Sequence, residues 1–301
     1  MRVLHFSDIH IGMHLREVPL RMWLGKRALG ALNLLAGRGR RFLANPSKLE
    51  ALAQFSRRHG IDLVVFTGDY TALGLEPELA AARLAVEPLM QAPLGYVDIP
   101  GNHDLYLFDV VREGWFERHF GDTLGSDLPE YRRDGPWPLV RLVGEEVAVV
   151  GVNTARPNPL LWRSSGRLPD AQLNALRELL CDPRVRERYV FVLCHYPPRL
   201  RDGRRDHPRH RMVNDNEFLD ACADIPRGAI LSGHVHHRYV VRVENVNPPI
   251  FCSGSTTMRG REGLWVFDID GAAVRATPGR WDGRDYVLLR DAAFDDNRSA
   301  I

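Results

Sequence analysis

The sequence predicts an α/β protein in which parallel strands come first and short strands come last. Strand-like apolar runs at residues 3–6, 61–66 and 94–99 alternate with helical patterns at 47–60 and 77–90. Because strands that alternate with helices form right-handed βαβ units, we expect a parallel sheet here. The composition agrees, since 45% hydrophobic and 26% charged residues are ordinary for a globular chain of 301 residues.

The second half of the chain first continues this pattern and then changes. We expect a β-hairpin at 140–152, a helix at 169–180, and strands at 189–193 and 229–232. Short strands dominate from 238 to about 277, which favours a second sheet.

Composition and charge bear on the number of domains, the location of the protein and its partners. We expect a single domain over 1–290 and a polar, frayed tail at 291–301. No signal-peptide pattern and no run of about 18 apolar residues is visible, so a cytoplasmic protein is expected. The net charge of +2 gives no reason to expect a nucleic-acid partner. The four cysteines form no CxxC pair and are expected to be reduced thiols.

Residues 15–48 have the character of a basic insertion. Eight cations stand against one acid here, a local charge of +7 in a protein whose total is +2. Apolar residues recur at helical spacing, which predicts a basic amphipathic helix. One hypothesis is a lid or a peripheral element at the inner membrane surface that attracts anionic lipid or substrate. The other is a helical insertion packed on the core with its arginines in water.

Five strand ends carry the residues of a candidate metal site. Members of the pairs Asp8/His10 and His234/His236 are two residues apart, so each pair faces one side of an extended segment. The carboxyl ends of parallel strands are where open α/β sheets bind ligands. Carboxylate, amide and imidazole donors without cysteine suit Mn, Fe or Zn and argue against a closed structural zinc site. The seven candidate ligands are Asp8, His10, Asp69, Asn102, His195, His234 and His236.

Asp69 is the candidate for joining two cations. Two metal ions about 3.5–4 Å apart need a shared ligand, and a carboxylate offers one oxygen to each. Two cations also lower the pKa of a water between them, which yields a hydroxide near neutral pH. The expected chemistry is therefore hydrolysis by a hydroxide held between two metal ions.

These motifs together resemble the calcineurin-like metallophosphoesterase family. They are Asp-x-His, Gly-Asp, Gly-Asn-His-Asp, a lone His and Gly-His-x-His, and they span residues 8–236. The resemblance implies a four-layer α/β/β/α sandwich of two mixed β-sheets flanked by helices, the metallo-dependent phosphatase fold. It also implies two divalent or mixed-valence metal ions. One would be held by Asp8, His10 and His236 and the other by Asn102, His195 and His234, with Asp69 shared.

The resemblance assigns catalytic roles to His103 and Asp104. In the family the histidine of Gly-Asn-His-Asp contacts the phosphoryl group or the leaving oxygen, so His103 is expected to stabilise the transition state or act as general acid. We expect Asp104 to orient and charge that imidazole; the alternative is a helix cap or loop acid. The Arg- and His-rich loop 199–211 either binds a second phosphate or acidic head group, or is a solvated loop offset by its own aspartates.

Three functions are compatible with these residues. The first is hydrolysis of a phosphodiester or pyrophosphate, with bacterial 3',5'-cyclic nucleotide phosphodiesterases among the groups that share the motifs. The basic insertion favours a second, hydrolysis of a lipid-linked nucleotide diphosphate at the membrane surface. The third is a non-catalytic scaffold of the same fold, against which the complete ligand set argues. We therefore expect a metal-dependent phosphoric ester hydrolase.

Overall fold

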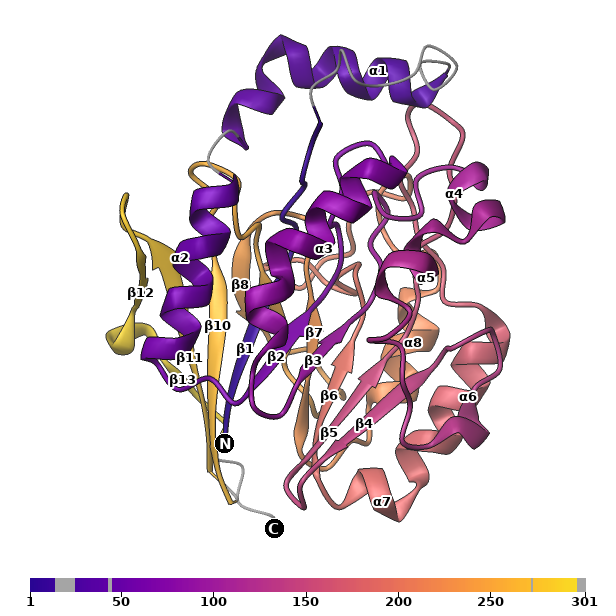
Figure 1. The fold of residues 1–301 in the computed structure, drawn as a ribbon. Coiled ribbons are helices and arrows are strands. Elements are labelled where there is room, and N and C mark those ends of the chain that lie inside the picture. The colour runs from indigo at the N-terminus through magenta and orange to yellow at the C-terminus, as the bar shows by residue number, and fades with distance from the viewer. Residues whose placement is uncertain (14–24, 43–44, 272, 297–301) are drawn as a thin grey trace.

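Two mixed β-sheets pack face to face between layers of helices in the computed structural model of the chain (Figure 1). The structure describes residues 1–13, 25–42, 45–271 and 273–296. Helices α2 (Asn45–Arg58) and α3 (Glu76–Met90) cover one sheet, and α6 (Asp170–Cys181) and α8 (Asp215–Cys222) cover the other. The predicted four-layer α/β/β/α sandwich is confirmed.

The first sheet contains the predicted parallel strands. Strands β1 (Arg2–Phe6), β2 (Leu63–Phe66) and β3 (Tyr96–Asp98) are parallel neighbours. Every residue of β2 is buried, as expected for a strand that is covered on both faces. On the other edge of β1, β10 (Leu264–Asp270) pairs antiparallel, and β11 (Ala273–Trp281) continues the sheet.

The second sheet is formed mainly by the middle of the chain. The predicted hairpin is β4 (Leu139–Val143) and β5 (Val147–Gly151), and β6 (Tyr189–Leu193) and β7 (Gly228–Ser232) follow parallel to β5. Strand β9 (Ile250–Ser253) lies parallel to β7, and β8 (Arg238–Val241) closes the edge.

The expectation that the short strands after residue 238 form the second sheet is therefore only half right. Strands β8 and β9 join that sheet, but β10 and β11 extend the first one. The reason is that β1 has an open edge opposite β2, and pairing with β10 satisfies its backbone N–H and C=O groups.

The predicted frayed tail is wrong as far as residue 296. Strand β13 (Phe294–Asp295) pairs with β11, and the Phe294 ring packs against Phe251 with 5.4 Å between centroids. Residues 297–301 lie outside the described part. Shorter elements elsewhere are α4 (Phe108–Glu113), α5 (Trp115–Phe120), α7 (Pro183–Arg186) and β12 (Tyr286–Leu288).

Helix α1 (Lys26–Asn33) lies across the end of the sandwich at which β1 finishes (Figure 1). Its orientation contradicts the hypothesis of an insertion packed on the core with its basic side chains in water, because Lys26 and Arg27 are buried. Leu32 on the helix and Leu35 just after it are instead 60% and 66% exposed. The hypothesis of a lid or membrane-surface element stays a prediction. The Arg27 guanidinium pairs with Asp109 and donates to two backbone carbonyls. Residues 15–24 and 43–44 of the predicted insertion lie outside the described residues. Over the part of the chain that the structure describes, no helix is long and apolar enough to cross a membrane.

Candidate metal centre

The structure brings all seven candidate ligands together at the carboxyl ends of β1, β2, β3, β6 and β7. They fall into two groups that have the carboxylate of Asp69 in common. In each group the possible ligand atoms lie within 4.8 Å of one another: Asp8, His10, Asp69 and His236 form one, and Asp69, His195 and His234 the other. Asn102 belongs with the second group, because its Oδ1 lies 3.1 Å from Nε2 of His195.

The spacing of the donor atoms fits two cations. Oδ2 of Asp69 lies 3.7 Å from Nε2 of His10 and 3.4 Å from Nε2 of His195, so one oxygen faces both groups. Nε2 of His236 is 3.0 Å from Nε2 of His10 and 3.1 Å from Oδ1 of Asp8. Two imidazole nitrogens therefore face each other beside two carboxylates. A cation between these four groups would stabilise this arrangement.

The second nitrogen of each histidine ligand is held by an acceptor. Nδ1 of His10 donates to the carbonyl of Thr71 at 3.0 Å, and Nδ1 of His195 donates to that of Thr67 at 2.7 Å. Nε2 of His234 donates to the carbonyl of His210 at 2.9 Å, and Nδ1 of His236 lies 3.2 Å from the sulfur of Met258. Such contacts set the tautomer and aim the other nitrogen at the metal.

Most of the candidate ligands also have an unusual backbone conformation, with a positive φ. Among the described residues, six other than glycine have positive φ, and five of these are candidate ligands. The left-handed region costs energy for such residues and persists where the surrounding structure enforces it, as at functional sites. The five are Asp8 (56°), His10 (45°), Asp69 (67°), His234 (66°) and His236 (54°).

The glycines of two motifs allow the strand ends to approach one another. A Cβ at Gly101 would collide with the carboxylate of Asp69, and a Cβ at Gly233 would collide with Ser7 and the carboxylate of Asp8. Neither glycine has a positive φ. Glycine is therefore needed at these two positions for close approach and not for a left-handed backbone.

His103 lies at the edge of the site, and Asp104 lies behind it. Nδ1 of His103 donates to the carbonyl of Ala72 at 2.6 Å. The carboxylate of Asp104 is buried and accepts from the backbone N–H groups of Asp69, Gly101 and Thr71 at 2.8 to 3.0 Å. The expected contact between Asp104 and the His103 imidazole is therefore wrong. Asp104 positions the two loops that carry Asp69 and Asn102.

The comparison with known families decides the identity of the site. The sequence matches the family model of calcineurin-like phosphoesterases over residues 1–238. The chain belongs to the calcineurin-like phosphoesterase family. It is a metal-dependent phosphoester hydrolase, and membership implies a dinuclear metal centre, which the two ligand groups fit. The scaffold hypothesis is therefore set aside.

Two solved structures show the same fold. A dimetal phosphatase from Danio rerio superposes with a TM-score of 0.64 at 13% identity, over 96% of this chain and 98% of that chain. A purple acid phosphatase from yellow lupin (Lupinus luteus) superposes with a TM-score of 0.59 at 12% identity, over 98% of this chain and 53% of that chain. No curated protein matches the sequence.

The electrostatics of this phosphoesterase centre couple metal binding to pH. Burial would lower the pKa of His195, but the Asp69 carboxylate beside it raises that pKa to about 9. Burial lowers the pKa of His234 well below its usual range, which keeps that imidazole neutral, the form that binds metals. A proton and a cation compete for His195, so metal affinity should fall as the pH is lowered.

The Arg- and His-rich loop packs beside the second ligand group, and three of its six arginines, Arg199, Arg204 and Arg205, form ion pairs with aspartates. Arg205 forms a two-pronged pair with Asp215 at 2.5 and 3.0 Å, and His210 contacts Asp206 at 2.7 Å. The His210 ring lies 4.2 Å from that of His234. The expected offset by the loop's own aspartates is present at Asp202 and Asp206, which pair with Arg204 and His210, and Asp215 outside the loop adds to it. Binding of a second phosphate by this loop stays a prediction.

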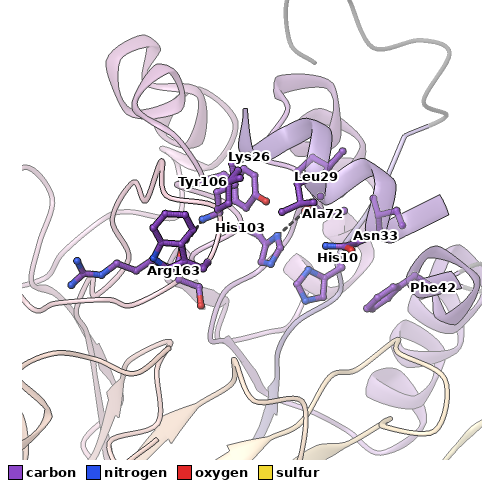
Figure 2. A pocket seen from close by; sticks show the side chains of 15 residues that line it. His10, Lys26, Leu29, Asn33, Phe42, Ala72, His103, Tyr106 and Arg163 are labelled. Atoms are coloured by element: carbon purple, nitrogen blue, oxygen red, sulfur yellow. Dashed lines mark hydrogen bonds between the residues drawn. The ribbon is translucent and has the colours of Figure 1, made fainter. Parts of the chain in front are cut away.

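A cavity of about 250 Å³ opens beside His10 and His103, beneath α1 (Figure 2). Its lining combines leucines and aromatic rings with the buried ammonium of Lys26. The sequence marked Lys26 only as one of eight cations in a basic segment, and nothing local marked Tyr106 or Trp162. Besides the two histidines, the lining includes Lys26, Leu29, Tyr106, Leu161 and Trp162.

Proposed function

We propose that this phosphoesterase hydrolyses a phosphodiester or a pyrophosphate at a dinuclear centre held by the seven candidate ligands. The observation that carries the proposal is the position of Asp69, whose Oδ2 lies within 3.7 Å of nitrogens of both ligand groups. When bound, two cations supply charge for the phosphoryl oxygens and lower the pKa of a water.

Asp69 and His103 carry the protein's own part of the reaction. Oδ1 of Asp69 accepts from the backbone N–H of His103 at 2.8 Å, so the shared ligand also fixes the position of that histidine. Because Nδ1 of His103 donates to Ala72, its Nε2 is turned away from that carbonyl. In the imidazolium form this nitrogen would donate its proton to the leaving oxygen. Burial alone would raise the pKa of Asp69, but the charges of His195 and His103 hold it well below its usual range, so Asp69 stays a carboxylate beside His103.

Phosphorus NMR of the Mn-loaded protein would test the proposal. Cyclic AMP and a UDP-linked diacyl sugar would be offered together, and Asp69→Asn would serve as the matched control. We expect loss of either the cyclic diester signal or the pyrophosphate signals with the wild type, and of neither with the variant. Persistence of both signals with Mn-, Fe- and Zn-loaded wild type would contradict the proposal.

A second and narrower candidate is a lipid-linked nucleotide diphosphate, favoured by an apolar rim around the cavity. Leu29 and Leu161 line the cavity and are partly exposed, and Trp162 beside them is 62% exposed. We count Leu32 and Leu35 with this rim, because they are exposed leucines of α1 and of the segment that follows it. A hydrocarbon chain attached to the substrate would cover these side chains and gain free energy from their burial. In the NMR experiment, loss of the pyrophosphate signals alone would support this candidate, and loss of the cyclic diester signal alone would exclude it.

A further inference from the structure

Lys26 places a positive charge inside the cavity, one aromatic ring away from His103. Its Nζ lies 4.6 Å from the centre of the Tyr106 ring, and that ring stacks on His103 with centroids 5.2 Å apart and planes at 19°. Figure 2 shows the three side chains side by side along the cavity wall. The Lys26 side chain is therefore on the side of the cavity where His103 would meet a leaving group.

Within the described residues, Lys26 forms two hydrogen bonds, both with backbone carbonyls. Nζ donates to the carbonyls of Asn158 at 2.9 Å and Arg163 at 3.0 Å, while an ammonium has three N–H donors. Within the described residues no carboxylate lies at ion-pair distance from Lys26, although Arg27 pairs with Asp109 and Lys48 pairs with Glu262.

A buried ammonium without a counter-ion is costly, and Lys26 is only 9% exposed. Burial lowers the pKa of Lys26 to about 8, and the Asp69 carboxylate partly opposes this. The ammonium thus remains mostly charged at neutral pH. Among the described residues, the carboxylate that raises the pKa of Lys26 is that of the candidate ligand Asp69, whose charge two bound cations would offset.

We propose that Lys26 forms an anion subsite that binds a second anionic group of the substrate, on the leaving-group side of His103. The inference rests on the function proposed above and narrows its substrate class to compounds with two linked phosphoryl groups. A diphosphate would place one phosphoryl group at the metal centre and the other against Lys26. A cyclic nucleotide has a single phosphoryl group, and its leaving hydroxyl carries no charge for Lys26 to bind.

A purely structural role for Lys26 is the alternative to be excluded. Its two hydrogen bonds to carbonyls connect α1 to the loop at 158–163, and their loss would destabilise this wall of the cavity. Lys26→Gln separates the two roles, because the glutamine amide keeps two N–H donors for these carbonyls but carries no charge. Arg27→Met is the matched control, since Arg27 ties the same helix to Asp109 but does not line the cavity.

The test is a binding measurement that does not depend on turnover. Methylphosphonate and methylenediphosphonate would be titrated calorimetrically into the Mn-loaded wild type and both variants. We expect Lys26→Gln to weaken binding of the diphosphonate roughly tenfold to a hundredfold, the loss of one hydrogen bond between charged groups, and that of methylphosphonate by less than about threefold. Arg27→Met should change both affinities in equal proportion.

Equal weakening of the two ligands by Lys26→Gln, or no weakening of either, would overturn the subsite and leave Lys26 as a structural tie. Turnover of bis(p-nitrophenyl) phosphate by the same preparations separates this result from failure of the proposed function. A wild type that binds the diphosphonate through Lys26 but hydrolyses no diester or pyrophosphate would refute the function and leave the subsite standing.

Discussion

The strand ends and helix α1 form two sides of one site, and they are built in opposite ways. At the strand ends, six of the seven candidate ligands are buried, and five have a left-handed backbone. On α1, leucines face solvent and the cations face inward. The difference suggests that the sheet edges hold the reacting groups rigidly, while an inserted helix shapes the pocket for a particular substrate.

The attachment of α1 supports this division. The helix is joined to the core by Ala31, which packs with Leu73 and Leu75, and by the pairing of Arg27 with Asp109. Gly30 allows the close approach, because a Cβ there would lie 2.7 Å from a methyl group of Leu73. None of these residues belongs to either ligand group, so the pocket wall can be altered without changing the metal ligands.

Replacing Asp69 should have the largest effect on activity, because its carboxylate is common to both groups of candidate ligands at the strand ends. Asp69→Asn keeps the shape but removes the charge, and we expect kcat to fall by about a thousandfold or more. Hydrolysis of bis(p-nitrophenyl) phosphate at saturating Mn would measure this, with metal content and melting temperature followed in parallel. Activity within tenfold of the wild type would show that Asp69 is not the shared ligand.

Replacing His103 should lower kcat by roughly a hundredfold or more without loss of metal, because it removes a proton donor at the leaving oxygen and no ligand. His103→Gln would be compared with His237→Gln, a change at an exposed histidine next to the last motif that contacts Arg261. The control should retain its kcat. Loss of bound metal from His103→Gln would contradict the role assigned to His103.

Glu78 holds the segment on which α1 packs, and its titration can be tested. Its Oε2 accepts from the backbone N–H groups of Leu73 and Leu75, and burial raises its pKa to about 7 from 4.5. The folded state therefore holds the proton more tightly than the unfolded state, and the free energy of unfolding should fall as the pH rises from about 5 to about 8.

Glu78→Gln removes this titration. Between about pH 5 and about pH 8 the difference in unfolding free energy should shift in favour of the variant by roughly 1–3 kcal/mol. Urea denaturation at the two pH values would measure it, with Glu87→Gln on the exposed side of α3 as control. A shift of equal size in the control would mean that Glu78 is not the group responsible.

The smallest effect should come from the apolar rim. Changing Leu32 and Leu35 together to serine should weaken binding to vesicles that contain anionic lipid by about tenfold, since each exposed leucine contributes about 1 kcal/mol or less. Vesicle sedimentation would measure this, and Leu84→Ser, at a 69% exposed leucine on α3, is the control. If the rim variant binds vesicles as well as the control does, the rim serves another purpose.

Local sequence determined the strands and the residues at their ends. The apolar runs that became β1, β2, β3, β6 and β7 each lead directly into a polar motif, and a strand's direction places that motif at a known edge. Seven candidate ligands could therefore be assigned to one site before their distances were known. Periodicity also indicated that the segment around α1 is helical.

Only the tertiary structure decided which face of α1 is buried and what its charges contact. Lys26 donates to carbonyls of residues 132 and 137 positions away, and Arg27 pairs with Asp109, 82 positions away. Asp104 likewise serves the backbone of a distant loop and not the neighbouring imidazole. Periodicity states which side chains share a face. It does not state whether that face meets solvent, because carbonyls and carboxylates brought close by the fold can satisfy a buried cation as well as water can.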